Sequence, residues 1–371
     1  AGQDIVLTID VAMQKQLEDI LKAGLERAKS QSGSAVIMDP NTGAIKAMAN
    51  WPTYDPANYD KVEDASLFSN AAVSSPIEVG STMKPLTAAA ALDKGVVNPD
   101  SSYYDPSFYE IDDFMVKNIE EDGGAGQKTV ADILNLSLNT GATWLLMQMG
   151  GNGGELTKED REVWYQYMTD HYMFGKETGI EQGYEAAGSV PDPNNGYARN
   201  LTYANTAFGQ AMTATPLQMA AAYSAMLNGG TYYKPHLVDY TVSSDGTKTA
   251  KKPEAVKQGV VSATVSKEMQ PMLEYVVNKH RFTVKFDQNT YGVGGKTGTA
   301  EIANPDGGYY TDKYNGTYMG FVGGNQPQYV IAVFVNDPKI AGYAGSQAAQ
   351  PLFADLAHML LDKFNVTPKQ R

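Results

Sequence analysis

The sequence predicts an α+β fold in which both ends of the chain complete one sheet and an all-helical insert lies between them. Strand-like runs and an amphipathic helix occur near each terminus, and Ala-, Leu- and Met-rich stretches with helical character dominate the middle. We expect residues 1–50 and 290–371 to form the sheet part, and roughly 51–289 to form the mainly helical part.

The N-terminal segment supplies a strand, a helix and a hairpin in that order. A short strand is expected at residues 4–9, and Asp10 is a plausible N-cap for the helix that follows. Apolar side chains then recur at 3.6-residue spacing up to Ala28, as in a helix with one buried face. Two β-rich arms, 34–39 and 44–49, are joined by an Asn/Gly turn, which predicts a β-hairpin.

The C-terminal segment mirrors this arrangement. Two strand-like runs, 317–322 and 329–335, precede a helix near 347–364. Both termini therefore offer strands that can pair in one sheet, together with a helix that can cover it.

The middle of the chain combines helices with long connections. Helices are expected at 85–94 and 216–228, while 130–149 alternates helical signals with a polar break. Two long polar connections, 95–128 and 150–199, are rich in Gly, Asp, Asn and Tyr. Loops of this length in a compact domain usually have a function, so we predict lids or binding walls there.

Composition excludes several classes of function. The 371 residues include 29 basic and 42 acidic side chains, a formal charge of −13, which argues against a nucleic-acid partner that needs clustered Lys and Arg. Cysteine is absent, so thiolate metal sites and a cysteine nucleophile are excluded. The sequence contains no run of 18 apolar residues, which is the length that would predict a membrane-spanning helix.

The first of three motifs is a Ser-x-x-Lys that occurs once, from Ser81 to Lys84. It opens a predicted helix, with Pro85 in the first turn, where a missing N–H costs nothing. Residues i and i+3 share a helix face, so the Lys84 amine can reach the Ser81 hydroxyl and take its proton. Alone this pattern is weak, because surface helices carry it by chance.

The second motif is the only Ser-x-Asn, formed by Ser137 and Asn139 in the polar break. A functional interpretation is a hydroxyl that shuttles a proton and an amide that holds a substrate backbone. Taken alone, an ordinary polar loop explains it equally well.

The third motif is the only Lys-Thr-Gly, at Lys296 to Gly298. A phosphate-binding loop is excluded because it would need glycine at the position of Thr290, and a dinucleotide fingerprint would need glycine at the position of Thr297. A glycine-rich strand usually means that a ligand or another backbone comes close.

Together, the three motifs in this order resemble those of the transpeptidase domain of class B (monofunctional, high-molecular-weight) penicillin-binding proteins. The hairpin from Asp39 to Met48 and the segment from Glu78 to Pro85 are also similar to that family. The resemblance covers nearly the whole chain. It implies one transpeptidase domain, residues 1–371, with a serine β-lactamase-like fold: a central antiparallel sheet with helices on both faces.

The resemblance also implies catalytic roles. Ser81 attacks the penultimate D-alanine carbonyl of a peptidoglycan stem peptide, and Lys84, which must be neutral to act, is the base. Ser137 relays the proton towards the leaving amine. Lys296 is the fourth expected catalytic residue. The backbone N–H groups of Ser81 and Thr299 form the oxyanion hole.

Substrate-binding roles follow from the same resemblance. Asn139 holds a substrate amide, and Lys296 and Thr297 bind the terminal carboxylate of D-Ala-D-Ala. Gly298 and Thr299 lie on the same strand, whose edge can pair with the substrate backbone. No metal and no other cofactor is implied.

The family further implies partners and a location. Stem peptides serve as donor and amine acceptor, β-lactams acylate the serine, and a membrane glycan polymerase is an expected partner. We expect a transmembrane anchor and a pedestal to precede this domain on the outer face of the bacterial cytoplasmic membrane. A β-lactamase, a D,D-carboxypeptidase and a non-enzymatic β-lactam sensor remain alternatives.

Overall fold

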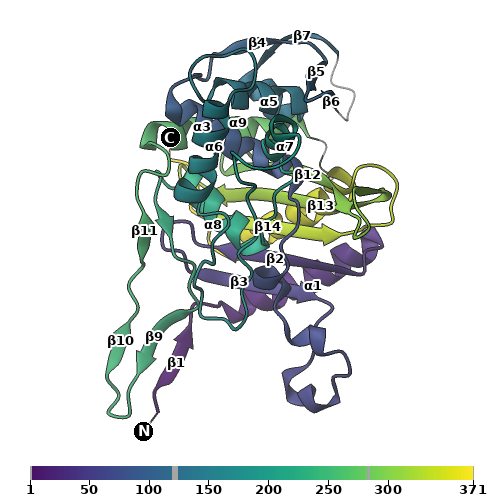
Figure 1. The fold of residues 1–371 in the computed structure, drawn as a ribbon. Coiled ribbons are helices and arrows are strands. Elements are labelled where there is room, and N and C mark those ends of the chain that lie inside the picture. Colours follow the sequence, from purple (N-terminus) through teal and green to yellow (C-terminus); the bar gives the residue numbers. More distant parts are fainter. Residues whose placement is uncertain (1, 119–123, 281, 283–284, 371) are drawn as a thin grey trace.

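The computed structural model describes the chain except for residues 1, 119–123, 281, 283–284 and 371. Its centre is a five-stranded antiparallel sheet (Figure 1), as predicted. In spatial order, the strands are β12 (Gly292–Ala303), β13 (Tyr309–Gly323), β14 (Pro327–Asn336), β2 (Ser32–Met38) and β3 (Ile45–Trp51). Both ends of the chain therefore contribute to one sheet.

The sheet is buried on both faces along its inner strands. Val36 pairs with Ala332 and lies in one hydrophobic core, whereas the next pair, Ile37 and Ile331, lies in the other. Successive side chains of a strand point to opposite faces, so a strand covered on both sides has a continuous apolar run rather than an alternating one.

Two helices from the chain ends cover one face: α1 (Val11–Ala28) and α10 (Gln350–Lys363). The predicted cap of α1 is confirmed, because the Met13 N–H donates a hydrogen bond to Asp10 Oδ1 at 3.0 Å. A short π-helical turn, Gly345–Ala349, leads into α10.

Helices of the insert cover the other face of the sheet. α8 (Pro216–Leu227) packs on β14 and β2 with every residue buried, and α9 (Ala263–Lys279) packs on β12. α3 (Lys84–Lys94) lies among these helices and is also nearly all buried. Helices that are apolar all round belong in the interior of a domain.

The insert also contains shorter helices. They are α2 (Ala71–Ser74), α4 (Val130–Asn135), α5 (Asn139–Gln148), α6 (Lys158–Gln166) and α7 (Arg199–Thr206), with 3₁₀ turns at Pro56–Lys61, Ala65–Phe68 and Gly80–Met83 and a π turn at Tyr167–His171. Among the described residues, no helix has both the length and the apolar composition that crossing a membrane requires.

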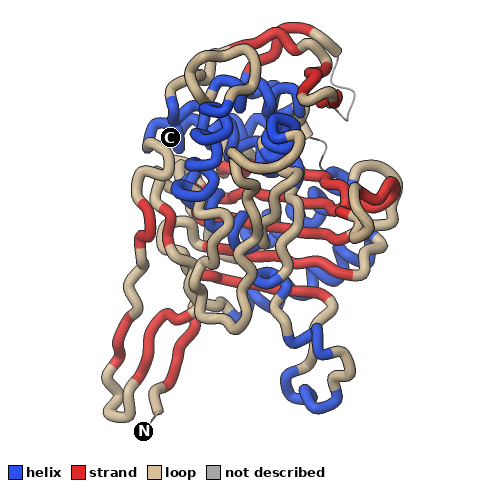
Figure 2. Tube along the Cα trace, viewed as in Figure 1, coloured by secondary structure: helices blue, strands red, loops and turns tan. Residues whose placement is uncertain are grey.

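The prediction of an all-helical insert is wrong in detail, because small sheets lie within it (Figure 2). The paired strands are β4 (Ser102–Asp105) with β7 (Gly126–Thr129), β5 (Phe108–Ile111) with β6 (Phe114–Lys117), and β8 (Tyr232–Tyr233) with β11 (Ala255–Lys257). The Tyr and Phe residues of β4, β5, β6 and β8 favour strands, but the surrounding Gly and Asp residues obscured that signal.

The first strand does not join the central sheet. β1 (Asp4–Leu7) pairs with β9 (Val238–Val242), which in turn pairs with β10 (Lys248–Ala250) in a separate sheet that extends away from the body (Figure 1). Ile5 and Leu7 are 62% and 50% exposed, so this strand lacks the two-sided burial of the central strands.

The cap of α1 gives a test of this part of the fold. Asp10→Ala removes the acceptor for the Met13 N–H and should lower the free energy of unfolding by about 1 kcal/mol. Chemical denaturation measures this change. Lys15→Ala is the matched control, because the Lys15–Asp19 ion pair is exposed to solvent and contributes little to stability. Equal effects of the two changes would contradict the assigned role of the cap.

Candidate active site

The Ser-x-x-Lys motif begins in a 3₁₀ turn (Gly80–Met83) and ends at the first residue of α3. Lys84 Nζ donates a hydrogen bond to Ser81 Oγ at 2.9 Å. Lys84 is fully buried, whereas Ser81 is half-buried. The predicted contact between amine and hydroxyl is therefore present, with the amine on the inner side of the hydroxyl.

The 3₁₀ turn Gly80–Met83 lies in close contact with strand β12. We call it the nucleophile turn, after the predicted role of Ser81. Gly80 has φ +64°, and a Cβ built there would lie 2.6 Å from the Thr299 carbonyl oxygen. The Gly80 N–H donates to Gly209 O at 3.0 Å, so the turn is also fixed from the opposite side. Only glycine combines this φ with such close backbone contact.

Hydroxyl groups hold the same turn from two directions. Thr82 Oγ1 and Thr317 Oγ1 both donate to the Val79 carbonyl oxygen, at 2.9 and 2.7 Å. Because Thr317 belongs to β13, these bonds attach the start of the helical part to the sheet. The position of Ser81 is therefore set by both parts of the molecule.

Ser137 lies between the two lysines of the motifs. It occupies the break between α4 and α5 with φ +57°, which turns its side chain and carbonyl towards Lys84. Lys84 Nζ donates to Ser137 O at 2.6 Å and to Ser137 Oγ at 3.1 Å, and Lys296 Nζ donates to the same Oγ at 3.0 Å. The two amines therefore lie within about 6 Å of each other, where like charges disfavour each other.

The Lys-Thr-Gly motif lies in β12, the edge strand of the central sheet, as predicted. Lys296 is buried and also donates to Thr297 O at 3.0 Å. A Cβ at Gly298 would lie 2.6 Å from Val79 O, so this glycine permits the close approach of the nucleophile turn. Thr299 Oγ1 accepts a hydrogen bond from the Gly345 N–H at 2.9 Å.

Asn139 is the first residue of α5, and its Nδ2 donates to Lys117 O at 3.1 Å. A narrow cleft of about 30 Å³ is lined by side chains from all three motifs and from one further loop. The lining residues are Ser81, Ser137, Asn139, Thr297, Thr299, Tyr343 and Ser346.

Of the predicted residues, Lys84, Lys296 and Gly298 do not line the cleft. Lys84 and Lys296 lie behind its surface and donate hydrogen bonds to the lining residues Ser81 and Ser137. Sequence reasoning missed Tyr343 and Ser346. Tyr343 comes from a loop and Ser346 from the π-helical turn that leads into α10, and neither segment carries a motif that could have marked them.

A larger cavity adjoins the cleft. It measures about 380 Å³ and shares Thr299 and Tyr343 with the cleft. Glu301 and Asp312 are among its lining residues, so its walls carry negative charge. The cleft therefore opens into a larger space along β12.

Two half-buried titratable groups flank the site. Burial raises the pKa of Glu78, whose Oε1 accepts hydrogen bonds from the Tyr309 hydroxyl and the Ala211 N–H, each at 3.0 Å. Burial, with a smaller contribution from the positive charge of Lys296, lowers the pKa of His280 to about 4. His280 is therefore neutral in the folded protein at neutral pH.

Comparison with known proteins agrees with this geometry. The family model "Penicillin binding protein transpeptidase domain" matches residues 33–358. Stage V sporulation protein D of Bacillus subtilis is 32% identical over 372 residues, covering 100% of this chain and 55% of that protein. Peptidoglycan D,D-transpeptidase FtsI of Escherichia coli is 28% identical over 371 residues, covering 99% of this chain and 58% of that protein.

Solved structures give the same result. Penicillin-binding protein 3 of Mycobacterium tuberculosis, complexed with aztreonam, superposes with a TM-score of 0.85 at 30% identity. The match covers 99% of this chain and 80% of that one. The chain spans about half the length of the curated relatives described above.

The chain belongs to the penicillin-binding protein transpeptidase family. Within that family it is a transpeptidase domain of the class B type, as its similarity to stage V sporulation protein D and to the mycobacterial penicillin-binding proteins shows.

The contact between the nucleophile turn and β12 can be tested at Gly80. Gly80→Ala should slow acylation of Ser81 by benzylpenicillin about 100-fold, because a shift of about 1 Å in a reacting group has that effect. Stopped-flow or mass-spectrometric acylation rates measure this. Gly95→Ala is the matched control: Gly95 also has positive φ, but an added Cβ meets nothing within 4 Å. Wild-type rates in Gly80→Ala would contradict the argument.

His280 gives a pH-dependent prediction. The unfolded chain takes up a proton at this side chain near pH 6.5, whereas the folded chain does so only near pH 4. Stability should therefore fall by about 1–3 kcal/mol as the pH drops from 6.5 to 4. Denaturation across this range should show a smaller slope for His280→Asn, and identical slopes would contradict the burial of a neutral imidazole.

Proposed function

We propose that this chain is the catalytic domain of a peptidoglycan D,D-transpeptidase, with residues 1–371 acting as one domain. The observation that carries the proposal is the continuous hydrogen-bonded chain from Ser81 Oγ through Lys84 Nζ and Ser137 Oγ to Lys296 Nζ. It connects a nucleophile and a relay at the surface of one cleft with a base buried behind them. FtsI, a relative of this chain, is named for D,D-transpeptidase activity.

In the first step, Ser81 Oγ attacks the penultimate D-alanine carbonyl of the donor stem as neutral Lys84 accepts the hydroxyl proton. An ester bond forms, and the amide bond to the terminal D-alanine then breaks. The proton passes by way of Ser137 to the departing amine. The 3.1 Å contact between Lys84 Nζ and Ser137 Oγ supports this route.

The proximity of Lys296 favours this proton flow. Lys296 contacts Ser137 Oγ from the side opposite Lys84. Its positive charge disfavours a positive charge on the nearby Lys84 amine, so it favours the neutral form that can accept a proton. The same charge, with Thr297 and Thr299, suits the terminal carboxylate of the donor. Asn139, at the opposite wall, would hold a substrate amide.

The tetrahedral intermediate needs two donors for its oxyanion. The close approach of the nucleophile turn to β12 supports the backbone N–H groups of Ser81 and Thr299 as that pair. Each such donor typically contributes about 3–4 kcal/mol to the transition state. In the second step, an amine from a neighbouring stem attacks the ester, which releases Ser81 and forms the cross-link.

The remaining parts of the proposal concern the setting. We infer a membrane-anchored protein facing outwards from the cytoplasmic membrane, with a membrane glycan polymerase as partner. Peptidoglycan stems are then the donor and acceptor, and β-lactams acylate Ser81 because they resemble the donor. A complex with aztreonam, known for the mycobacterial structure, supports the last point.

Intact mass after incubation with benzylpenicillin tests the nucleophile. We expect a one-to-one adduct that persists for hours in the wild type and is absent in Ser81→Ala. Lys84→Ala should slow its formation by a factor of about 10²–10⁴, the usual contribution of a general base. An adduct that disappears within minutes while penicilloate accumulates would instead indicate a β-lactamase.

The acceptor distinguishes the remaining alternatives. A donor stem peptide incubated with an added amine should yield the transpeptidation product in preference to the hydrolysed acid. Hydrolysis alone would indicate a D,D-carboxypeptidase. A stable penicillin adduct without turnover of any stem peptide would indicate a sensor.

A further inference from the structure

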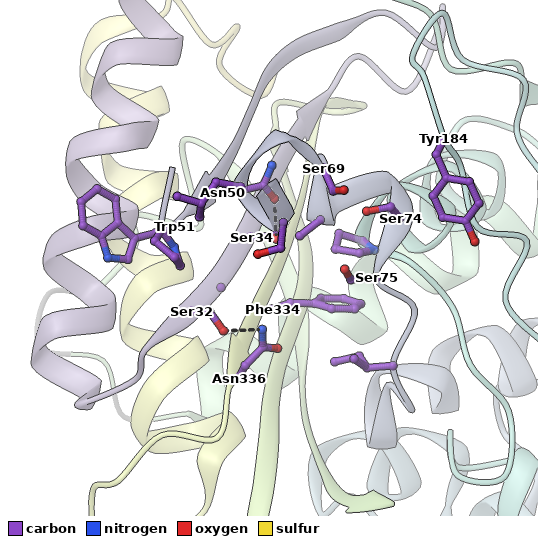
Figure 3. A pocket seen from close by; sticks show the side chains of 17 residues that line it. Ser32, Ser34, Asn50, Trp51, Ser69, Ser74, Ser75, Tyr184, Phe334 and Asn336 are labelled. Carbon is purple, nitrogen blue, oxygen red and sulfur yellow. Dashed lines mark hydrogen bonds between the residues drawn. The ribbon is translucent and has the colours of Figure 1, made fainter. Parts of the chain in front are cut away.

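A second cavity, of about 430 Å³, lies at the ends of strands β2, β3 and β14, away from the catalytic edge strand (Figure 3). The segment from Ser66 to Ser75, which includes α2, forms another wall. The volume is within the range of ligand-binding pockets, about 300–1,000 Å³. None of the motif residues lines it.

The lining of this cavity has an unusual composition. Charged residues make up 19% of the chain, yet none of the 17 residues that line the cavity is charged. The lining instead combines hydroxyl, amide and aromatic groups. These are the serines Ser32, Ser34, Ser66, Ser69, Ser74 and Ser75, the amides Asn50 and Asn336, and the rings of Trp51, Tyr184 and Phe334.

The polar groups belong to the sheet itself. Ser34 lies two residues before Val36 and therefore on the same face of β2, where the apolar core gives way to polar side chains. It is 4% exposed, pairs with Phe334 across the sheet, and donates to Asn50 Oδ1 at 2.7 Å. A buried hydroxyl in place of an aliphatic side chain costs stability unless it is satisfied, so this polar end of the sheet is a built feature.

Hydrogen bonds orient these groups and leave capacity for a ligand. Asn336 Nδ2 donates to Ser32 Oγ at 2.9 Å (Figure 3), which leaves the Ser32 hydroxyl hydrogen and the side-chain oxygen Oδ1 of Asn336 available. Asn50 Nδ2 donates in turn to Asn70 Oδ1 at 2.7 Å. The cavity therefore presents donors and acceptors in fixed positions, without a formal charge.

Two aromatic side chains stand at the sides of the cavity, and only one of them has a free face. The Trp51 ring is already covered on one side by Lys22, whose Nζ lies 4.8 Å from the ring centre. Tyr184, on the opposite side in Figure 3, is 76% exposed and presents an apolar ring to solvent. A rigid ring with a polar tip suits ligands that are themselves part apolar and part polar.

We propose that this cavity binds a neutral carbohydrate, namely the glycan strand that carries a stem peptide. Sugar hydroxyls and N-acetyl groups both donate and accept hydrogen bonds, pyranose rings have apolar faces that pack on aromatic rings, and neither needs a charged partner. This inference rests on the proposed function, which makes a peptide-bearing glycan the substrate.

The position of the cavity fits that substrate. Ser75 and Ile77 line the cavity, and Ser81 follows Ser75 by six residues, a distance of at most about 22 Å along an extended chain. A stem of five residues in extended form spans about 17 Å. The length of a stem is thus of the same order as the largest separation that the chain allows between Ser75 and Ser81, so the proposal requires the stem to run from the cavity towards Ser81.

The test uses an uncharged glycan without a stem, the β-1,4-linked tetramer of N-acetylglucosamine, and enzyme already acylated by benzylpenicillin. Calorimetry or protein NMR should show one-to-one binding that persists when Ser81 is blocked. Tyr184→Ala and Ser75→Trp should each weaken binding at least tenfold. Both positions are exposed, and circular dichroism checks that the variants fold.

Tyr197→Ala is the matched control, because Tyr197 is 88% exposed and does not line the cavity. It should bind the tetramer as the wild type does. Three results would overturn the proposal: no binding at millimolar tetramer, binding that is lost on acylation, or binding unchanged in both cavity variants. If Ser81 is not acylated at all, the proposed function fails, and the tetramer titration on unmodified enzyme still tests the cavity.

Discussion

The close backbone contact between the nucleophile turn and strand β12 is the constraint on which the rest of this structure depends. Gly80 and Gly298 leave no room for a Cβ, and a Cβ at Gly209 would lie 1.9 Å from Gly80 O. Three glycines from distant parts of the chain thus permit one point of contact. Because Ser81 follows Gly80 directly, the proposed nucleophile lies against the strand that carries Lys296.

The hydrogen bonds around this contact explain why it is rigid. The Val79 carbonyl accepts two threonine hydroxyls, one from its own turn and one from β13. The Tyr223 hydroxyl of α8 donates to the Thr82 carbonyl just beyond. A reacting group held to within a fraction of an ångström needs such support from several elements, because each bond alone contributes only about 1 kcal/mol.

Local sequence patterns were sufficient for some parts of the architecture and insufficient for others. Apolar periodicity and the Asp10 cap predicted α1 and the central sheet, because both depend on interactions close in sequence or on burial of both faces. The pairing of β1 with β9, in which Ile5 lies opposite the distant residue Thr241, has no local signal. Nor do the aromatic strands between 102 and 117 stand out from their polar surroundings.

The candidate site shows the same division. The i, i+3 spacing of Ser81 and Lys84 predicted their contact from helix geometry alone, and the structure contains it. That Ser137 would contact both lysines depends on a left-handed residue in the break between two helices, which no spacing reveals. Tyr343 and Ser346 line the cleft from a segment without any motif, the loop and π-helical turn before α10, so only the tertiary structure identifies them.

Strand β12 lies at the edge of the central sheet, and this position bears on how a substrate could bind. An edge strand with unpaired N–H and C=O groups is a liability, and proteins usually cover or blunt it. Here the nucleophile turn and α9 pack against β12, while Thr297 and Thr299 remain at the cleft surface. Under the proposed function, an extended substrate peptide that pairs with this remaining edge would gain main-chain hydrogen bonds and bring its carbonyl to Ser81 in the same movement. The helical part would then limit the edge to one opening, and the glycines allow Ser81 to reach that opening.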